Sequence, residues 1–377
     1  MATYYVRPDG SDTNSGTGSG TGSAWQTFSK VVTAGTPVVG GDTVYFAPGV
    51  YRNSATITST LNPSSLVQFI GDVSASQFSG VTPGVVRLTY FTNDNSAPAA
   101  TTLQLQSMGN VSFDNFYFEM NVSFTTGNAA KPNITFTKCH FGVSSAATLV
   151  TFNFDTTSAL NYTFDKCIFE DSGISLTGFG TTASEVNLNV SITNCFFRNT
   201  TCAGLSFSGT AGIGRKYGGV NITNCTFVTG QISLNIGNAA DVSLTYPMTA
   251  KNCVWACVTT ATQAPANVAN SIQLYNCRLN GSTVASATTL NSSFANGIHG
   301  LDDYARLIHG VGKRHPYMPR YTTVLSGQGT ATGAPAADLF GYTRPSPPAI
   351  GVLEINDLTG SSGGLIVHPG MTGGMRG

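Results

Sequence analysis

Two glutamates follow the same aromatic residue of a repeated sequence unit, and carboxylates placed in this way can carry out acid–base chemistry. Glu119 and Glu170 each come directly after a phenylalanine that closes a strand-like octet. If the octets stack as neighbouring strands, these two carboxylates lie two coils apart, roughly 9 to 10 Å. That spacing is at the far edge of the range for an acid and a base that cleave a glycosidic bond with inversion. In the same arrangement, Glu170 forms a small polar cluster with Asp171 and Arg198.

A simpler interpretation is that these side chains are solvated ends of strands, and we favour it. The chain has only 18 acidic residues, and few of them fall in adjacent copies of the repeat. Asp114 and Asp165 share another outward position, which capping of a turn explains equally well. Cys139 and His140 are adjacent, but neighbouring residues of a strand point to opposite faces and cannot share one metal ion. We therefore predict no catalytic residue, no cofactor and no metal site, although an active site shared between subunits stays open.

An octet that recurs seven times must position these residues. Its copies begin at Val111 and end at Leu279, and they read VSFDNFYF, ITFTKCHF, YTFDKCIF, VSITNCFF, VNITNCTF, MTAKNCVW and IQLYNCRL. Apolar residues at positions 1 and 3 enclose a polar one, and this period of two predicts a strand. Position 5 is Asn or Lys, and Asn tolerates the left-handed backbone of a sharp bend. The interval of 23 to 30 residues between copies suits one coil of a parallel β-solenoid.

Stacking of the coils would place like residues in columns. Position 8 predicts a mostly aromatic interior column, position 6 a cysteine column, and position 5 an interrupted asparagine ladder. The expected members are Phe118, Phe141, Phe169, Phe197, Phe227, Trp255 and Leu279; Phe116, Cys139, Cys167, Cys195, Cys225, Cys253 and Cys277; and Asn115, Asn194, Asn224, Asn252 and Asn276. Each large buried side chain contributes about 1.5 to 3 kcal/mol of transfer free energy. We expect the thiols to serve as small apolar filling.

The composition excludes several classes of protein. Charged residues make up 10% of the 377-residue chain, and Lys+Arg and Asp+Glu both total 18. A nucleic-acid binder needs an excess of basic side chains, so this class is excluded. The low charge and 10% aromatic content argue against intrinsic disorder. No apolar run is long enough to span a bilayer, and the N-terminal residues carry no export signal, so we expect free thiols rather than disulfides.

Several segments outside the octets carry a resemblance to a known family. They read YVRPDGSD from Tyr5, AWQTF from Ala24, GDTVYFAPGVY from Gly41, LVQFIGD from Leu66 and DLFGYTRP from Asp338. Together they resemble right-handed parallel β-helix proteins of the pectin-lyase-like superfamily. The resemblance implies an all-β, right-handed parallel β-helix with a short N-terminal capping helix and an irregular C-terminal arm. It implies no single function, because the superfamily includes lyases, hydrolases, viral spikes and non-catalytic surface proteins.

The expected organisation is one solenoid followed by an arm. We predict a parallel β-helix of about ten coils over residues 1–290, with an N-terminal cap at about 1–40 and a capping helix from Trp25 to Ala34. Residues 291–377 are expected to form a C-terminal cap or arm. The densest charge of the protein lies in this arm and makes it a possible docking segment. Its candidate docking residues are Arg306, His309, Lys313, Arg314 and Arg320.

These features lead to a functional prediction. We expect a non-enzymatic structural or adhesive component of a tailed-phage particle, either a capsid decoration or a tail spike or fibre. The expected partners are other copies in a homotrimer and other virion proteins, with host-surface glycans as a candidate ligand and without nucleic acid or membrane insertion. The expected location is the virion, since phage proteins leave the cell by lysis. The alternatives are a polysaccharide lyase or glycoside hydrolase, and a bacterial surface carbohydrate-binding protein.

Overall fold

The chain folds into two compact units. The computed structural model describes residues 1–33, 35–52, 57–59, 61, 63–89, 102–104, 109–119, 121–126, 133–142, 148–154, 161–170, 172–177, 185–199, 205–208, 216–229, 232–236, 246–257, 260–263, 272–280, 283–284, 288–291, 294–295, 329–339, 341–348 and 350. Among these residues, the first unit comprises 1–163 and 174–177, and the second comprises 164–173 and 185–350.

Both units consist almost entirely of short strands. The earlier elements are β1 (Thr3–Val6), α1 (Phe28–Val32), β2 (Thr43–Phe46), β3 (Gly49–Arg52), β4 (Ile57–Thr58), β5 (Val67–Gly71), β6 (Val86–Thr89), β7 (Thr102–Gln104), β8 (Val111–Asp114), β9 (Phe116–Glu119), β10 (Asn121–Thr126), β11 (Asn133–Thr137), β12 (His140–Phe141), β13 (Thr148–Phe154), β14 (Asn161–Asp165) and β16 (Ser172–Thr177). The later ones are β15 (Ile168–Glu170), β17 (Glu185–Thr193), β18 (Phe196–Asn199), β19 (Leu205–Ser208), β20 (Lys216–Thr223), β21 (Thr226–Thr229), β22 (Ile232–Ile236), β23 (Met248–Lys251), β24 (Val254–Cys257), β25 (Thr260–Gln263), β26 (Ile272–Tyr275), β27 (Arg278–Asn280), β28 (Thr283–Val284), β29 (Thr288–Asn291) and β30 (Phe294–Ala295).

Each octet is a strand, a bend of one or two residues and a second strand, as its pattern predicts. In the first copy, β8 ends at Asp114, Asn115 takes a φ of 62°, and β9 begins at Phe116. The other bend residues have φ between 50° and 56°: Lys138, Lys166, Asn194, Asn224, Asn252 and Asn276. Asparagine suits this position because its short polar side chain lowers the cost of the left-handed region. The bend turns the chain from one sheet into the next.

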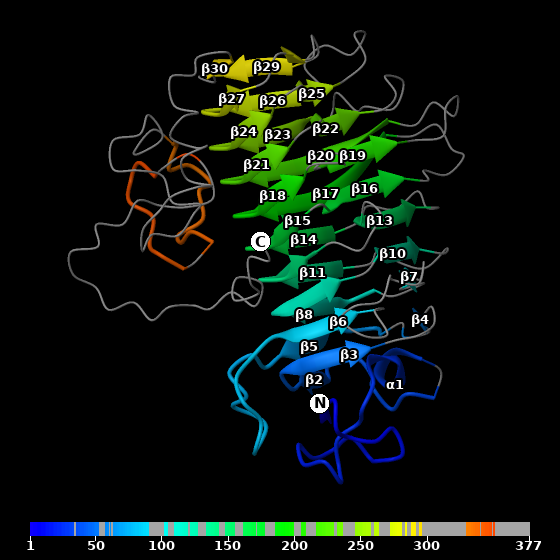
Figure 1. The fold of residues 1–377 in the computed structure, drawn as a ribbon. Coiled ribbons are helices and arrows are strands. Elements are labelled where there is room, and N and C mark those ends of the chain that lie inside the picture. The colour runs from blue at the N-terminus through cyan, green and yellow to red at the C-terminus, as the bar shows by residue number, and fades with distance from the viewer. Residues whose placement is uncertain are drawn as a thin grey trace, which may run out of the picture. The chain divides into compact units, whose positions relative to one another are not determined.

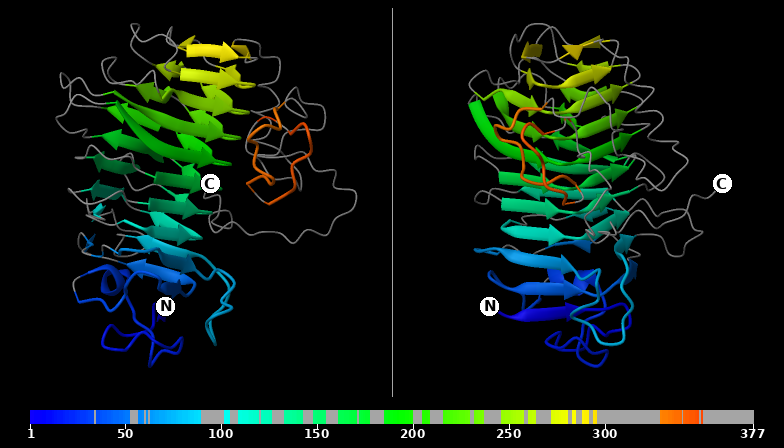
Figure 2. Two further views of the ribbon diagram at one scale, coloured as in Figure 1. Left: turned by 180° about the vertical axis from the view of Figure 1, so that it is seen from behind. Right: turned by 90° about the vertical axis from the view of Figure 1, so that its left-hand side faces the viewer.

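The strands stack in parallel, coil upon coil, in each unit (Figure 1). In the first unit the hydrogen-bonded orders are β1-β2-β5-β8-β11, β3-β6-β9-β12 and β4-β7-β10-β13. In the second they are β17-β20-β23-β26-β29, β15-β18-β21-β24-β27-β30 and β19-β22-β25-β28. The chain therefore visits three sheets in turn, and Figure 2 shows the same succession from two other sides. This architecture is a right-handed parallel β-helix, so the predicted fold class is confirmed.

The interior of the second unit is built from the predicted columns. The rings of Phe169, Phe197 and Phe227 stack at centroid separations of 4.5 Å. The thiols of Cys195 and Cys225 are fully buried and free of disulfides, in agreement with the sequence. Each thiol also donates a hydrogen bond to the carbonyl of octet position 3 in the preceding coil, over 3.5 Å and 3.4 Å. The thiols thus satisfy buried carbonyl groups as well as fill space.

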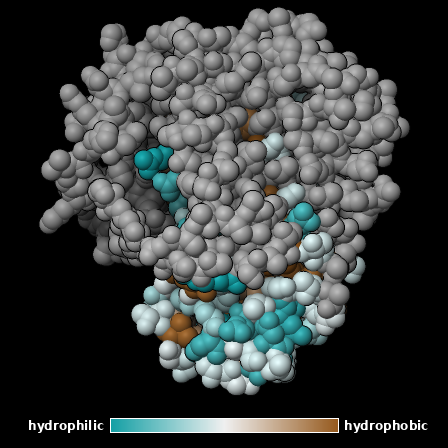
Figure 3. Space-filling view, turned by 45° about the vertical axis from the view of Figure 1, so that its right-hand side comes forward, coloured by the Kyte–Doolittle hydropathy of each residue, from teal (hydrophilic) through white to brown (hydrophobic). Residues whose placement is uncertain are grey.

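The face of the first unit that is drawn in colour in the space-filling view is mostly polar (Figure 3). Hydrophilic residues dominate the coloured lower part of the space-filling view, where the hydrophobic patches are small (Figure 3). The large hydrophobic side chains that are exposed among the described residues are Met1, Val39, Val50 and Leu66. The described part of the chain contains no helix long and apolar enough to cross a bilayer.

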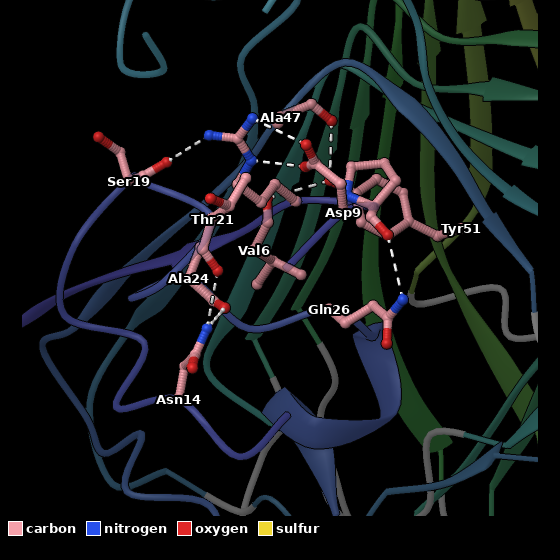
Figure 4. Close-up of polar contacts among 11 residues, drawn as sticks. Val6, Asp9, Asn14, Ser19, Thr21, Ala24, Gln26, Ala47 and Tyr51 are labelled. Carbon is pink, nitrogen blue, oxygen red and sulfur yellow. Dashed lines mark hydrogen bonds and ion pairs between the residues drawn. The ribbon is translucent and has the colours of Figure 1, made fainter. Parts of the chain in front are cut away.

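The N-terminal cap contains a helix shorter than the predicted Trp25 to Ala34. Helix α1 begins after Thr27, whose hydroxyl accepts a hydrogen bond from the Lys30 amide. Trp25 instead forms a parallel bridge with Val6, and its indole donates to the carbonyl of Asn14. Asn14 donates in turn to the carbonyls of Thr21 and Ala24, as Figure 4 shows. The Gly- and Ser-rich run before the helix is therefore fastened to the cap by its own hydrogen bonds.

A second row of asparagines, which the sequence reasoning did not identify, runs along the start of β8, β11 and β14. Asn133 donates its amide to Asn110 over 2.8 Å, and Asn161 donates to Asn133 over 2.7 Å. Asn110 donates onward to the carbonyl of Pro63. These side-chain amides therefore link successive coils of the first unit.

The carboxyl group of Asp114 is partly buried on the outer face of the first unit and should make stability depend on pH. Its Oδ1 is buried and accepts no hydrogen bond from the described residues, and burial raises its pKa although the charge of Lys138 lowers it in part. A raised pKa means that the folded state disfavours the carboxylate, so stability falls as pH rises through the folded pKa. We expect Asp114→Asn to raise the Tm at pH 7, and the gain to vanish below pH 3.8, the usual value. Thermal melts across pH measure this.

Asp9 supplies the control of opposite sign. Its hydrogen bond from Arg7 lowers its pKa, so the folded state favours the carboxylate. Asp9→Asn should therefore lower the Tm at pH 7, with the loss fading as the pH falls. Equal behaviour of the two variants would contradict this electrostatic assignment.

Candidate functional site

A row of polar side chains crosses β6, β9 and β12 on the outward side of the first unit. Arg87 is in register with Tyr117, and Tyr117 is in register with His140. Their neighbours along each strand, such as Phe118, are fully buried in the interior. Because side chains alternate along a strand, the row faces outward. Glu119 lies two residues after Tyr117 and shares its face. We call Arg87, Tyr117, Glu119 and His140 the outer cluster.

Ionic and ring contacts hold the outer cluster together. The Arg87 Nε donates to Glu119 Oε2 over 2.7 Å, and its Nη2 contacts the same oxygen. The Arg87 guanidinium also lies 5.9 Å from the centre of the Tyr117 ring. The Tyr117 and His140 rings stack at 4.5 Å with an interplanar angle of 16°. Glu119 and His140 are buried, so these interactions are little screened by solvent.

The side chains of the outer cluster are better suited to binding a ligand than to catalysis. Arginine and an aromatic ring are side chains that bind polar and ring-shaped ligands. Glu119 is committed to the guanidinium of Arg87, and a charge-assisted bond of this kind is among the stronger hydrogen bonds. The carboxylate must therefore leave its partner before it can attack or protonate a substrate.

A glycine makes room for the tyrosine of the outer cluster. A Cβ on Gly142 would lie 2.4 Å from the Tyr117 hydroxyl and 2.5 Å from its ring. We expect Gly142→Ala to push the ring off His140 and lower the free energy of unfolding by about 1 to 3 kcal/mol. Urea titration and the NMR shifts of the His140 ring measure the two effects. Gly84→Ala is the matched control, because its nearest contact is at 3.6 Å. An unchanged His140 ring in Gly142→Ala would contradict the packing.

The other candidate carboxylate belongs to an exposed ion pair in the second unit. Glu170 on β15 is in register with Arg198 on β18, and Arg198 Nη1 donates to Glu170 Oε1 over 3.1 Å. The side chains are 38% and 47% exposed, so the pair contributes little stability. The structure thus brings together two members of the predicted polar cluster. Asp171, the third, lies outside the described residues.

Of the remaining site predictions, one can be compared with the structure and the other concerns residues that the structure does not describe. The Cys139 thiol is buried in the interior while His140 stacks outward on Tyr117, so the two side chains leave the strand on opposite faces. The described residues contain no group of three metal-binding side chains. The candidate docking residues lie outside the described part of the chain: Arg306, His309, Lys313, Arg314 and Arg320.

Sequence reasoning missed three members of the outer cluster. Tyr117 and His140 both occupy octet position 7, and reading that position as a column would have found them. Arg87 lies in a coil without the octet, so its register with Tyr117 becomes visible only in the paired strands.

Solved structures are the known proteins to which this chain shows similarity. No protein-family model matches the chain, and no curated protein matches it. Among solved structures it is similar to pectate lyase Pel9A, with 14% identity over 94% of this chain and 97% of that one, at a TM-score of 0.41. A GH136 lacto-N-biosidase from Eubacterium ramulus is 10% identical over 78% of this chain and 55% of that one, at 0.41. A rhamnogalacturonan lyase is 13% identical over 67% and 87%, at 0.32. The fold assignment rests on the strand pairing described above.

Proposed function

We propose that the chain is a non-enzymatic structural or adhesive component of a tailed-phage particle, either a capsid decoration or a tail spike or fibre. The observation that supports a non-enzymatic role is the pairing of both candidate carboxylates. Glu119 is bound by Arg87 and Glu170 by Arg198, each across neighbouring strands. A carboxylate that is hydrogen-bonded to a guanidinium must leave that partner before it can act as acid, base or nucleophile. The ion pairs therefore favour a structural use of these residues.

The regular coils support a load-bearing role. In a solenoid each coil is stabilised by its neighbours, so a continuous interior column makes a stiff body. The outward octet positions 2 and 4 carry mainly uncharged polar residues, such as Thr135, Ser191 and Thr223. A surface with little net charge does not steer partners over long range, so specific contacts fall to the few charged and aromatic residues that it carries. The outer cluster is the candidate for such a contact, with a host-surface glycan as ligand.

The partners and location follow from this proposal. Copies of the chain associate as a homotrimer, bind other virion proteins and reside in the virion. Gradient-purified particles from a lysate of the encoding phage would be analysed by quantitative mass spectrometry. The proposal expects peptides of this chain in intact particles at a copy number that is a multiple of three. Recovery of the chain only in the particle-free fraction would overturn it.

The outer cluster favours a second candidate, a polysaccharide lyase or glycoside hydrolase. It gathers a carboxylate, a guanidinium, a phenol and an imidazole on three successive strands. Capsular and pectic polysaccharides incubated with the full chain would be assayed for unsaturated products and new reducing ends. The leading proposal expects no cleavage. Cleavage that is lost in Glu119→Gln and kept in the matched Glu170→Gln would replace it with this second function.

A further inference from the structure

The described residues between 329 and 350 form a hairpin in the second unit, far along the chain from the strands that it contacts. The Gly329 amide donates to the Pro348 carbonyl at its base, and Ala337 bridges Thr343 in antiparallel fashion near its tip. At the tip, Asp338 Oδ1 accepts from the Tyr342 amide over 2.9 Å. The segment also contains four prolines, Pro335, Pro345, Pro347 and Pro348. The hairpin is therefore closed by its own bonds and pre-organised.

Two asparagines of the bend ladder bind this hairpin. Asn194 donates to the Ala337 carbonyl over 3.0 Å and accepts from Arg344 Nη2 over 2.9 Å. Two coils further along, Asn252 donates to the Thr330 carbonyl and accepts from the Thr330 amide, both over 2.8 Å. Both asparagines are at most 1% exposed. The ladder thus binds the tip and the base of the hairpin at two fixed points.

An apolar contact and a close backbone approach also hold the hairpin against the second unit. Val254 occupies octet position 7, which faces outward, yet it is 4% exposed because Ile350 packs on it. Gly329 lies against Asn252 so closely that a Cβ there would be 3.1 Å from the Asn252 amide group. Figure 2 shows the hairpin, in orange, beside the strands of the second unit. The asparagines, Val254 and the close approach at Gly329 form what we call the ladder surface.

We propose that the ladder surface is a peptide-recognition site, and that residues 329–350 of a second copy of this chain dock on it in trans. The two asparagines form hydrogen bonds with the backbone of Thr330 and Ala337 and with one side chain, that of Arg344. These contacts are the same whichever copy of the chain supplies the hairpin. Residues 296–328 connect β30 to the hairpin and at about 3.3 Å per residue can reach roughly 100 Å. This inference holds whether or not the chain belongs to a particle.

The backbone conformation of the bends allows the side-chain amides of Asn194 and Asn252 to be removed without disturbing the bends. Asn194 and Asn252 have positive φ, which glycine adopts without strain, so Asn→Gly removes the amide and leaves the bend. Full-length Asn194→Gly/Asn252→Gly retains its hairpin but lacks the ladder contacts. Full-length Arg344→Ala retains the ladder and has a weakened hairpin. Asn276→Gly is the control, because Asn276 is a bend asparagine that makes no hydrogen bond to the described hairpin residues.

A mixing experiment tests the proposal. The double-glycine chain and Arg344→Ala, labelled with different fluorophores, would be mixed and followed by energy transfer and analytical ultracentrifugation. We expect the mixture to associate at least about tenfold more tightly than either variant alone. Arg344→Ala alone lacks the charge-assisted contact, the double variant alone lacks all four ladder hydrogen bonds, and one charge-assisted contact is worth about that factor. Asn276→Gly should behave as the unmodified chain.

Two results would overturn the proposal. One is a mixture that associates no more tightly than the separate variants while circular dichroism shows both folded. The other concerns a synthetic peptide of residues 329–350, which keeps the test decisive if the double variant does not fold. The labelled peptide should bind Arg344→Ala more tightly than the unmodified chain, whose own hairpin competes. Equal or absent binding to the two would contradict the proposal.

Discussion

Phe197→Ala is expected to lower the free energy of unfolding of the second unit by about 3 to 5 kcal/mol, the usual cost of an aromatic truncation in a core. Phe197 is fully buried between Phe169 and Phe227, and its ring is parallel to theirs within 3° and 8°. Truncation removes both ring contacts and leaves a cavity that stiff neighbouring coils cannot fill. Urea titration followed by far-UV circular dichroism measures the change in the free energy of unfolding.

The adjacent Arg198→Ala is the control for this prediction. Its side chain is 47% exposed and contributes only the ion pair with Glu170, so its removal should cost no more than about 1 kcal/mol. A cost for Phe197→Ala as small as that of the control would show that the aromatic column does not support the second unit.

Trp25→Ala is expected to cost the first unit a similar amount, about 3 to 5 kcal/mol. Trp25 is 1% exposed, stacks on Tyr4 at 4.9 Å, and donates its indole hydrogen to the Asn14 carbonyl. The side chain closes the cap, because Gly16 passes directly over its ring. Its removal opens a cavity and frees the loop that the ring holds. Urea unfolding and proteolysis of residues 10–23 measure both effects.

Gln26→Ala provides the matched control in the cap. Gln26 is exposed and makes one side-chain hydrogen bond, to the Pro8 carbonyl over 3.2 Å, so its loss should cost about 0.5 kcal/mol. If Trp25→Ala left the loop as resistant to protease as Gln26→Ala does, the indole would not be the fastening of the cap.

The octets made most of the fold predictable. Their period of two and the residue at position 5 correspond to the two strands and the left-handed bend, and the interior columns follow from stacking alone. The capping helix was predicted too long. The sequence pattern does not show that Trp25 pairs with Val6, or that Asp12 binds the amides of Gln26 and Thr27 and so delays the helix.

The candidate site was less predictable, because its contacts join distant parts of the chain. A glutamate at a strand end is visible in the sequence, but the arginine that pairs with Glu119 is 32 residues away, in a coil without the octet. The contact between Arg344 and Asn194 spans 150 residues. Asparagine at the bend was explained by backbone conformation, and that local reason concealed its second use as a binding group for the hairpin.

The measurement that tests the account most directly is the reactivity of the column cysteines. Native protein would be treated with iodoacetamide, and alkylation at Cys195, Cys225 and Cys253 would be followed by mass spectrometry with and without urea. All three thiols are fully buried, so the reagent cannot reach their sulfur atoms in the native protein. The account predicts labelling only in urea. Rapid labelling of the native protein at these positions would contradict the stacked, dry coils.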